Sequence, residues 1–162
     1  MYSELVKAEL DEEWDRKKSF DQRGQALLTT SASISSIALG VVSLGAHELG
    51  IGLKAPTLTG VGIGLFFLFA AVAMGIRTSS LLKYDGVKTS DLSRLLKREF
   101  WEAGESIATL RTTEVRIEIL KRARELNEYK SQFLGWGQWF QLIGLIALGA
   151  AAVSFLLTGP QP

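Results

Sequence analysis

The sequence predicts an all-α integral membrane protein in which three transmembrane helices extend into a cytoplasmic helical bundle. Charge is segregated along the chain: Lys, Arg, Asp and Glu fill 1–23 and 77–130, whereas 25–46, 55–76 and 136–157 contain none of them. At about 1.5 Å per residue each uncharged segment reaches about 33 Å, enough to cross a hydrocarbon core of about 30 Å. A soluble core helix of that length would show a charged outer face.

The distribution of Lys and Arg predicts the orientation. Residues 1–24 carry five, residues 77–135 carry twelve, and the short loop 47–54 carries only Lys54. Because cytoplasmic segments are enriched in Lys and Arg, we expect the N-terminus and the long loop in the cytoplasm and the C-terminus on the exterior of a bacterial inner membrane.

Four parts follow along the chain. They are a cytoplasmic amphipathic helix (1–24), the first two transmembrane helices with a short exterior loop (25–76), a cytoplasmic helical region (77–135) and the third transmembrane helix with a short exterior tail (136–162). The first part is charged, which argues against a cleavable signal peptide. It contains no helix breaker before Gly24, so we expect one long helix that runs on into the first span.

The cytoplasmic region predicts two more helices. Asp85-Gly86 marks a turn, a helix is expected over 91–103, and another over 106–134 leads into the third span through Gly135 and Gly137, where a kink is expected. Apolar residues at helical spacing should bury against one another or against a second subunit. In the helix expected over 1–24 they are Leu5, Leu10, Trp14 and Phe20. In the helix expected over 106–134 they are Ile107, Leu110, Val115, Ile119, Leu126, Tyr129 and Phe133.

The first span carries a stripe of small, weakly polar residues spaced by three and four. Two interpretations remain open for it. In one, neighbouring helices approach closely along the stripe and the hydroxyls bond to backbone carbonyls. In the other, the stripe lines a water-filled path in an oligomer. Its members are Ala26, Thr29, Ser33, Ser36, Gly40, Ser43 and His47.

The second span contains "GVGIG", with Gly60 and Gly64 four apart, and Ala71 and Gly75 repeat this spacing. The spacing is typical of close helix packing. A dinucleotide-binding turn would need a preceding strand, and a potassium filter would need threonine at Gly60 and a pore helix before it. Helix packing is therefore favoured.

The third span repeats the pattern on one face, formed by Gly137, Gln141, Gly144, Ala147, Ala151 and Ser154. Gln141 is costly in lipid unless it pairs, so we expect it to face protein and to bond to a hydroxyl of the first span. Trp136 and Trp139 lie near the cytoplasmic boundary and are typical of an interfacial anchor.

Charged residues flank the spans at similar depth. Asp21 and Arg23 precede the first span and Arg77 follows the second. They predict either an Asp21–Arg77 ion pair that ties the two spans together or two independent ends that reach toward water.

No catalytic or metal-binding constellation is present. The chain has no cysteine and one histidine, His47, beside Glu48, so we expect neither an enzyme nor a metal or cofactor site. The cytoplasmic region balances twelve basic against nine acidic residues, which argues against nucleic-acid binding. One candidate site for an anionic ligand remains, the arginine group Arg111, Arg116, Arg122 and Arg124.

The order of these parts resembles a broad group of small membrane proteins of actinobacteria and their phages, related to the SLATT and Pycsar-type transmembrane effectors. The residues that carry the resemblance are Asp21, Arg23, Leu27 and Leu28 before and within the first span, and Arg124, Asn127 and Lys130 before the third. The resemblance implies a role in cellular conflict, in which such effectors oligomerise and permeabilise the inner membrane when a nucleotide-sensing partner is triggered. No sensor domain is recognisable here, so the signal would come from another protein or from a ligand of the cytoplasmic bundle.

We therefore expect an oligomeric inner-membrane protein that acts as a membrane-perturbing or pore-forming effector in anti-phage defence. One alternative is a membrane-anchored adaptor or scaffold, such as a phage-encoded exclusion protein. Another is a holin-like lysis protein, although the 59 residues between the second and third spans exceed the usual cytoplasmic part of a holin.

Overall fold

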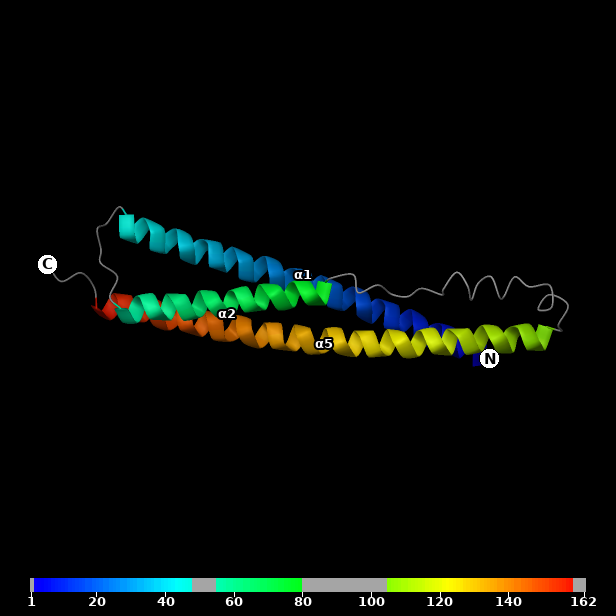
Figure 1. Ribbon diagram of the computed structural model, residues 1–162. Coiled ribbons are helices and arrows are strands. Elements are labelled where there is room, and N and C mark those ends of the chain that lie inside the picture. Colours follow the sequence, from blue (N-terminus) through cyan, green and yellow to red (C-terminus); the bar gives the residue numbers. More distant parts are fainter. Residues whose placement is uncertain (1, 48–54, 80–104, 159–162) are drawn as a thin grey trace. The chain divides into compact units, whose positions relative to one another are not determined.

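A computed structural model of the chain describes residues 2–47, 55–79 and 105–158, and all of them are helical (Figure 1). The helices are α1 (Tyr2–His47), α2 (Ala55–Ser79) and α5 (Glu105–Thr158). Each is long and apolar enough, by length and composition, to cross a membrane. The helix predicted over 91–103, the turn at Asp85-Gly86 and most of the loop 47–54 lie outside the described residues.

Two of the helices combine charged and uncharged sequence. The prediction of one continuous helix from the N-terminus through the first span is confirmed by the 46 residues of α1. α5 continues for 54 residues and passes through Gly135 and Gly137 without ending. Glycine costs a helix interior only about 1 kcal/mol, and no proline interrupts either helix.

The chain divides into two compact units. The charged unit comprises Met1–Phe20 and Ser80–Lys130, and the apolar unit comprises Asp21–Ser79 and Ser131–Pro162. The unit boundaries fall within five residues of the ends expected at 24, 76 and 135.

In the charged unit α1 and α5 run parallel. Hydrogen bonds join residues of the two helices at nearly constant sequence separations of 113, 114 and 115. The buried positions of α5 follow helical spacing and are Leu120, Ala123, Asn127 and Lys130. A polar seam therefore accompanies the apolar one.

Within a single chain, the apolar stripes of the charged unit are buried only in part, and their burial against a second subunit stays a prediction. Leu5 is 62% exposed and Trp14 is 41% exposed, and Ile107, Leu110 and Tyr129 are also exposed. In the part of α1 that belongs to the charged unit, the buried side chain is Glu13. The helix is thus rotated so that a satisfied polar group, and not the larger apolar ones, faces α5.

In the apolar unit α2 runs antiparallel to α1 and α5. A Cβ on Gly60 would meet Ala151, whereas one on Gly64 would meet Leu148 and the Gly144 carbonyl. The residue number of the contact on α5 thus decreases as the residue number on α2 increases, as in an antiparallel pair. A Cβ on Gly75 would likewise meet the Gly24 carbonyl of α1 at 3.0 Å. Helices can approach this closely only because the contact positions lack side chains.

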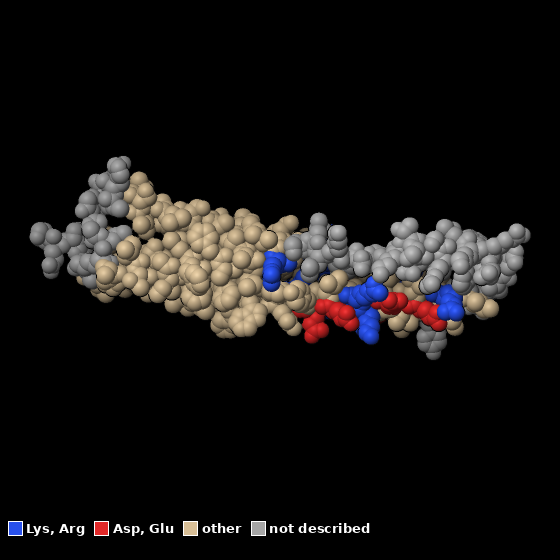
Figure 2. Space-filling model, viewed as in Figure 1, with Lys and Arg blue, Asp and Glu red and all other residues tan. Residues whose placement is uncertain are grey.

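The surface of the described residues changes character along α5. In Figure 2, blue and red atoms gather over the N-terminal half of α5, whereas its C-terminal half is covered by uncharged residues. Large apolar side chains are exposed on the apolar unit, among them Phe66 (69% exposed), Ile37 and Leu157. An apolar surface this continuous is unusual for a protein in water and marks contact with lipid or with protein.

Candidate functional site

The small, weakly polar stripe predicted on the first span lies on the outer face of α1. Its members between residues 26 and 43 are all exposed: Ala26, Thr29, Ser33, Ser36, Gly40 and Ser43. A Cβ added to Gly40 would meet no atom within 4 Å. The stripe therefore makes no helix contact within the apolar unit.

The hydroxyls of this stripe are bonded to their own helix. Thr29 donates to the Gln25 carbonyl at 2.9 Å and Ser36 donates to the Ala32 carbonyl at 3.0 Å. Such back-bonding satisfies the hydroxyl hydrogen and leaves the oxygen lone pairs directed outward. The face is therefore polar enough to contact water or another hydroxyl and small enough to admit a second helix backbone.

The buried face of α1 is a different set, Gly24, Leu27, Ser31 and Ser35, on the opposite side of the helix. Reasoning from the sequence missed this set because small residues occur around the whole helix in "TTSASISS". The signal that could have found it is Gly24. A Cβ there would meet the Thr78 side chain at 3.0 Å, so the position has room only for glycine against α2.

The small faces predicted on the second and third spans do meet each other. A Cβ on Gly144 would lie 3.0 Å from the Gly64 carbonyl oxygen and 3.0 Å from Leu68 Cγ. A Cβ on Gly64 would lie 2.7 Å from Leu148 Cγ. Gly60, Gly64 and Gly144 thus form a tight α2–α5 crossing.

Gln141 joins α5 to α1. Its Nε2 donates to Thr30 Oγ1 at 3.0 Å, and Thr30 in turn donates to the Ala26 carbonyl at 2.8 Å. The expected hydroxyl partner on the first span is therefore Thr30, the neighbour of the stripe member Thr29.

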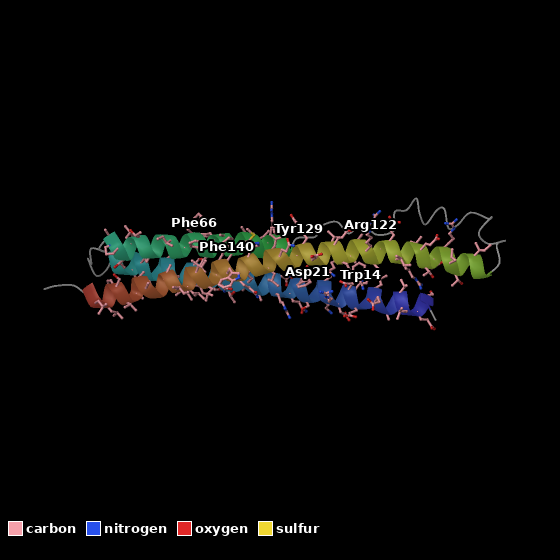
Figure 3. The ribbon with its side chains drawn as sticks, turned by 90° about the horizontal axis from the view of Figure 1, so that it is seen from below. Trp14, Asp21, Phe66, Arg122, Tyr129 and Phe140 are labelled. Carbon is pink, nitrogen blue, oxygen red and sulfur yellow. The ribbon has the colours of Figure 1, made fainter. Side chains whose placement is uncertain are left out.

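Aromatic side chains gather around Phe140 (Figure 3). Its ring centroid lies 5.9 Å from that of Phe67 on α2 and 6.1 Å from that of Trp136. Trp136 and Trp139 are both exposed, so their indoles are available to a lipid–water interface.

The residues predicted at the membrane edge all lie in the apolar unit. The guanidinium carbon of Arg77 lies 5.6 Å from the centre of the Phe133 ring, a cation–π distance. Asp21 is half-buried and Arg23 is exposed. The Asp21–Arg77 ion pair stays a prediction.

The four arginines predicted to bind an anion do not converge. Arg111 pairs with Glu114 at 2.9 Å and Arg122 pairs with Glu118 at 2.7 Å, both on the surface of α5. Arg116 donates to Ser3 Oγ at 3.0 Å, and Arg124 bonds to Glu9. Each guanidinium already has a partner from the chain, so the described residues offer no arginine cluster to a free phosphate.

The charged unit holds buried polar residues that the sequence did not single out as a site. Glu13 is 4% exposed, Asn127 is 2% exposed and Lys130 is 1% exposed. Burial raises the pKa of Glu13, but the hydrogen bond from Asn127, the charge of Arg16 and the hydrogen bonds from Arg16 and Arg124 outweigh burial and hold the pKa below its usual value. The carboxylate is therefore ionised at neutral pH. The sequence carries a signal for this burial. Asn127 and Lys130 continue the helical spacing of the apolar residues Leu120 and Ala123, so all four lie on one face of the helix.

Among residues 2–47, 55–79 and 105–158, no group of three or more His, Asp or Glu side chains could hold a metal ion. In comparisons with protein-family models, with curated proteins and with solved structures, no similar protein was found.

Proposed function

We propose that this chain is a non-enzymatic protein of the bacterial inner membrane that self-associates and perturbs the membrane as a pore-forming or permeabilising effector in cellular conflict. α1, α2 and α5 would span the bilayer through the apolar unit, and the charged unit would lie in the cytoplasm with the N-terminus. The C-terminus would lie outside.

The observation that carries the proposal is the outward stripe of α1. Contact with lipid does not require small hydroxyl side chains. A glycine such as Gly40 lowers helix stability, and a Cβ at this position would meet no atom of its own unit within 4 Å. Small faces are where membrane helices meet. A second copy of the same face would bury Ser33, Ser36 and Gly40 and bring several hydroxyls to one axis, which suits a weakly selective pore.

The assignment to cellular conflict is supported by the resemblance of the sequence to SLATT and Pycsar-type effectors. It is also consistent with the division into units, because a cytoplasmic helical unit on the same two helices as the spans can receive a trigger. That trigger would come from a sensor partner or a ligand.

Membrane insertion and orientation are tested first. The protein should stay in the membrane pellet after carbonate extraction, and protease should reach residues near 110 only from the cytoplasmic face. Recovery of the intact chain from the soluble fraction without detergent would end the proposal.

Self-association is tested with cysteines, because the chain has none of its own. Gly40→Cys should give disulfide-linked dimers in native membranes, whereas Gly149→Cys, which is equally free of neighbours on α5, should not. Equal cross-linking at both positions would indicate random collision and contradict the stripe as the interface.

Activity is tested by induced expression with a membrane-potential dye. The wild type should depolarise cells, Gly40→Leu should abolish depolarisation at equal protein level, and Gly149→Leu should leave it unchanged. If the inserted wild type neither depolarises cells nor slows growth, even beside its neighbouring genes, the effector function is wrong.

An adaptor or scaffold is the second candidate, favoured by apolar side chains exposed on the charged unit, among them Leu5, Leu110 and Ile117. These side chains could bind a cytoplasmic partner. Replacing all three spans with unrelated ones separates the two functions. An adaptor should keep its activity after the exchange, whereas a pore should lose it.

A further inference from the structure

Asn127 of α5 is bonded twice to one residue of α1. Its Nδ2 donates to the main-chain carbonyl oxygen of Glu13 at 2.9 Å and to Glu13 Oε2 at 2.8 Å. A side-chain amide has two N–H groups, so both are used on Glu13. The amide thus binds both the backbone and the side chain of the same residue of α1.

The second carboxylate oxygen of Glu13 is also satisfied. Arg16 Nη1 lies 3.0 Å and Arg124 Nε lies 3.4 Å from Glu13 Oε1. Arg124 in addition bonds to Glu9 one turn earlier on α1. Two residues of α5 that are three apart in sequence therefore bind two residues of α1 that are four apart. We call these four residues, Glu9, Glu13, Arg124 and Asn127, the polar clamp.

The polar clamp has the properties of a register device. Buried ionic groups add little net stability compared with apolar residues of similar size, but a single polar pair in a helix seam can fix register. The buried apolar neighbours Leu120 and Ala123 carry no side-chain hydrogen-bonding group that would select one register. A shift of one turn would separate Asn127 from Glu13 and leave a buried carboxylate without its donor. We call the register with the Asn127–Glu13 contact the closed state, and a register without this contact the open state.

The contact is also one that water can replace. Arg124, Arg16 and Glu9 are exposed or half-buried, so opening the clamp exposes charges that are already close to solvent. α1 and α5 each continue as one helix past residues 20 and 130 into the apolar unit. A change of register between them in the charged unit therefore acts on the same helices that carry the spans.

We propose that the polar clamp is a releasable latch that holds α1 and α5 in a resting register, and that its opening switches on the membrane activity of this chain. The inference rests on the function proposed above. The trigger would be whatever binds the charged unit more tightly in the open register.

Three variants of the full chain test the latch. Asn127→Asp places a carboxylate against Glu13 and should open it. Glu13→Gln removes the charge that Arg16 and Arg124 bind. The double variant Glu13→Gln/Asn127→Asp exchanges amide and carboxylate, so it should restore the bond between the two side chains but not the bond to the main-chain carbonyl of residue 13. Asp11→Asn, at an exposed position of α1 that carries no label, is the control for loss of one negative charge.

Opening is measured directly by spin labels on cysteines introduced at the exposed positions 12 and 128, with labelled protein diluted in unlabelled protein. The wild type and the double variant should give a narrow distance distribution, and Asn127→Asp a broad one. Because an open population rises tenfold for each about 1.4 kcal/mol, Asn127→Asp should depolarise cells at about a tenfold lower protein level than the wild type. The double variant should return toward the wild-type level.

Each other outcome has a defined meaning. If Asn127→Asp broadens the distances but leaves depolarisation unchanged, or if the single variants only lower the protein level and the activity together, the latch is wrong and the contact serves folding alone. If no variant depolarises cells, including one whose spin labels show that the clamp is open, the proposed function fails and the switch fails with it. The distance data alone then decide whether the clamp fixes register.

Discussion

α1 and α5 meet in both units, but by different chemistry. In the charged unit the contact uses long polar side chains, with Asn127 bonded to the buried Glu13 at 2.8 Å. In the apolar unit α1 contacts α5 through Leu27 against Gly137 and through one hydrogen bond, from Gln141 to Thr30. α2 adds glycine contacts with backbone atoms, at Gly64 and Gly75.

We attribute the difference to the surroundings proposed for the two units, water for the charged unit and lipid for the apolar unit. Where water is near, a polar contact can open because its groups are rehydrated, so its closed state is specific without being permanent. Where the surroundings are apolar, there is little to gain from burying more apolar surface, and close backbone approach supplies the packing. We therefore expect the charged unit to be the part that switches and the apolar unit to be the part that holds.

The strongest test of the apolar contacts is Gly75→Leu. A Cβ there would already lie 3.0 Å from the Gly24 carbonyl oxygen and 3.1 Å from the Leu28 nitrogen, both backbone atoms that cannot move aside. We expect a loss of about 3 kcal/mol, measured by thermal unfolding in detergent. Gly62→Leu, where a Cβ would meet nothing within 4 Å, is the control and should lose nothing. Equal stability of the two variants would mean that α1 and α2 do not pack as described.

The polar contacts are tested by Asn127→Leu alone and together with Glu13→Leu. The single change leaves the Glu13 carboxylate without its buried donor and should destabilise the charged unit by about 2 kcal/mol. The double change removes both polar partners and should recover most of that loss, since apolar pairs replace buried ionic contacts well. Protection of α1 amides from hydrogen exchange measures both. If the double variant is less stable than the single one, the clamp contributes stability and not only register.

The sequence predicted the apolar unit better than the charged one, and particular residues show why. On 136–157 the small residues Gly137, Gly144 and Ala151 recur every seven residues and are buried, so this face was readable from the sequence. On 25–46 small residues occur on every face. Ser33 and Ser36, which are exposed, could not be told from Ser31 and Ser35, which are buried.

The charged unit shows a second limit. Spacing of apolar residues predicted that Leu5 and Trp14 face inward, yet Glu13 is the buried side chain. Burial of a carboxylate depends on its donor, and Asn127 lies 114 residues away along the chain. Local pattern carries no information about such a partner. The partners of Arg116 and Arg124 are equally distant in sequence, because both arginines bond to residues of α1.

Acid should weaken the contacts of the charged unit and leave those of the apolar unit unchanged. The pKa of Glu13 is lowered in the folded chain, so its contribution to stability is present above the ordinary Glu pKa of about 4.3 and is lost as pH falls through the lower folded value. Spin labels at positions 12 and 128 should report opening of the charged unit in this range, while the glycine contacts of the apolar unit do not titrate. Glu13→Gln should shrink the response. An unchanged response would show that Glu13 is not the titrating group.

The smallest expected effect is that of the hydrogen bond from Gln141 to Thr30 in the apolar unit. Gln141→Leu removes the donor to Thr30 Oγ1, but Thr30 keeps its own bond to the Ala26 carbonyl, so no buried group is stranded. Hydrogen bonds between membrane helices average about 0.6 kcal/mol, and we expect a loss of that size in detergent unfolding. In a double-mutant cycle Thr30→Val should cost little more once Gln141 is leucine. A coupling energy as large as that of Glu13 with Asn127 would contradict the comparison, because the apolar unit would then also depend on a polar latch.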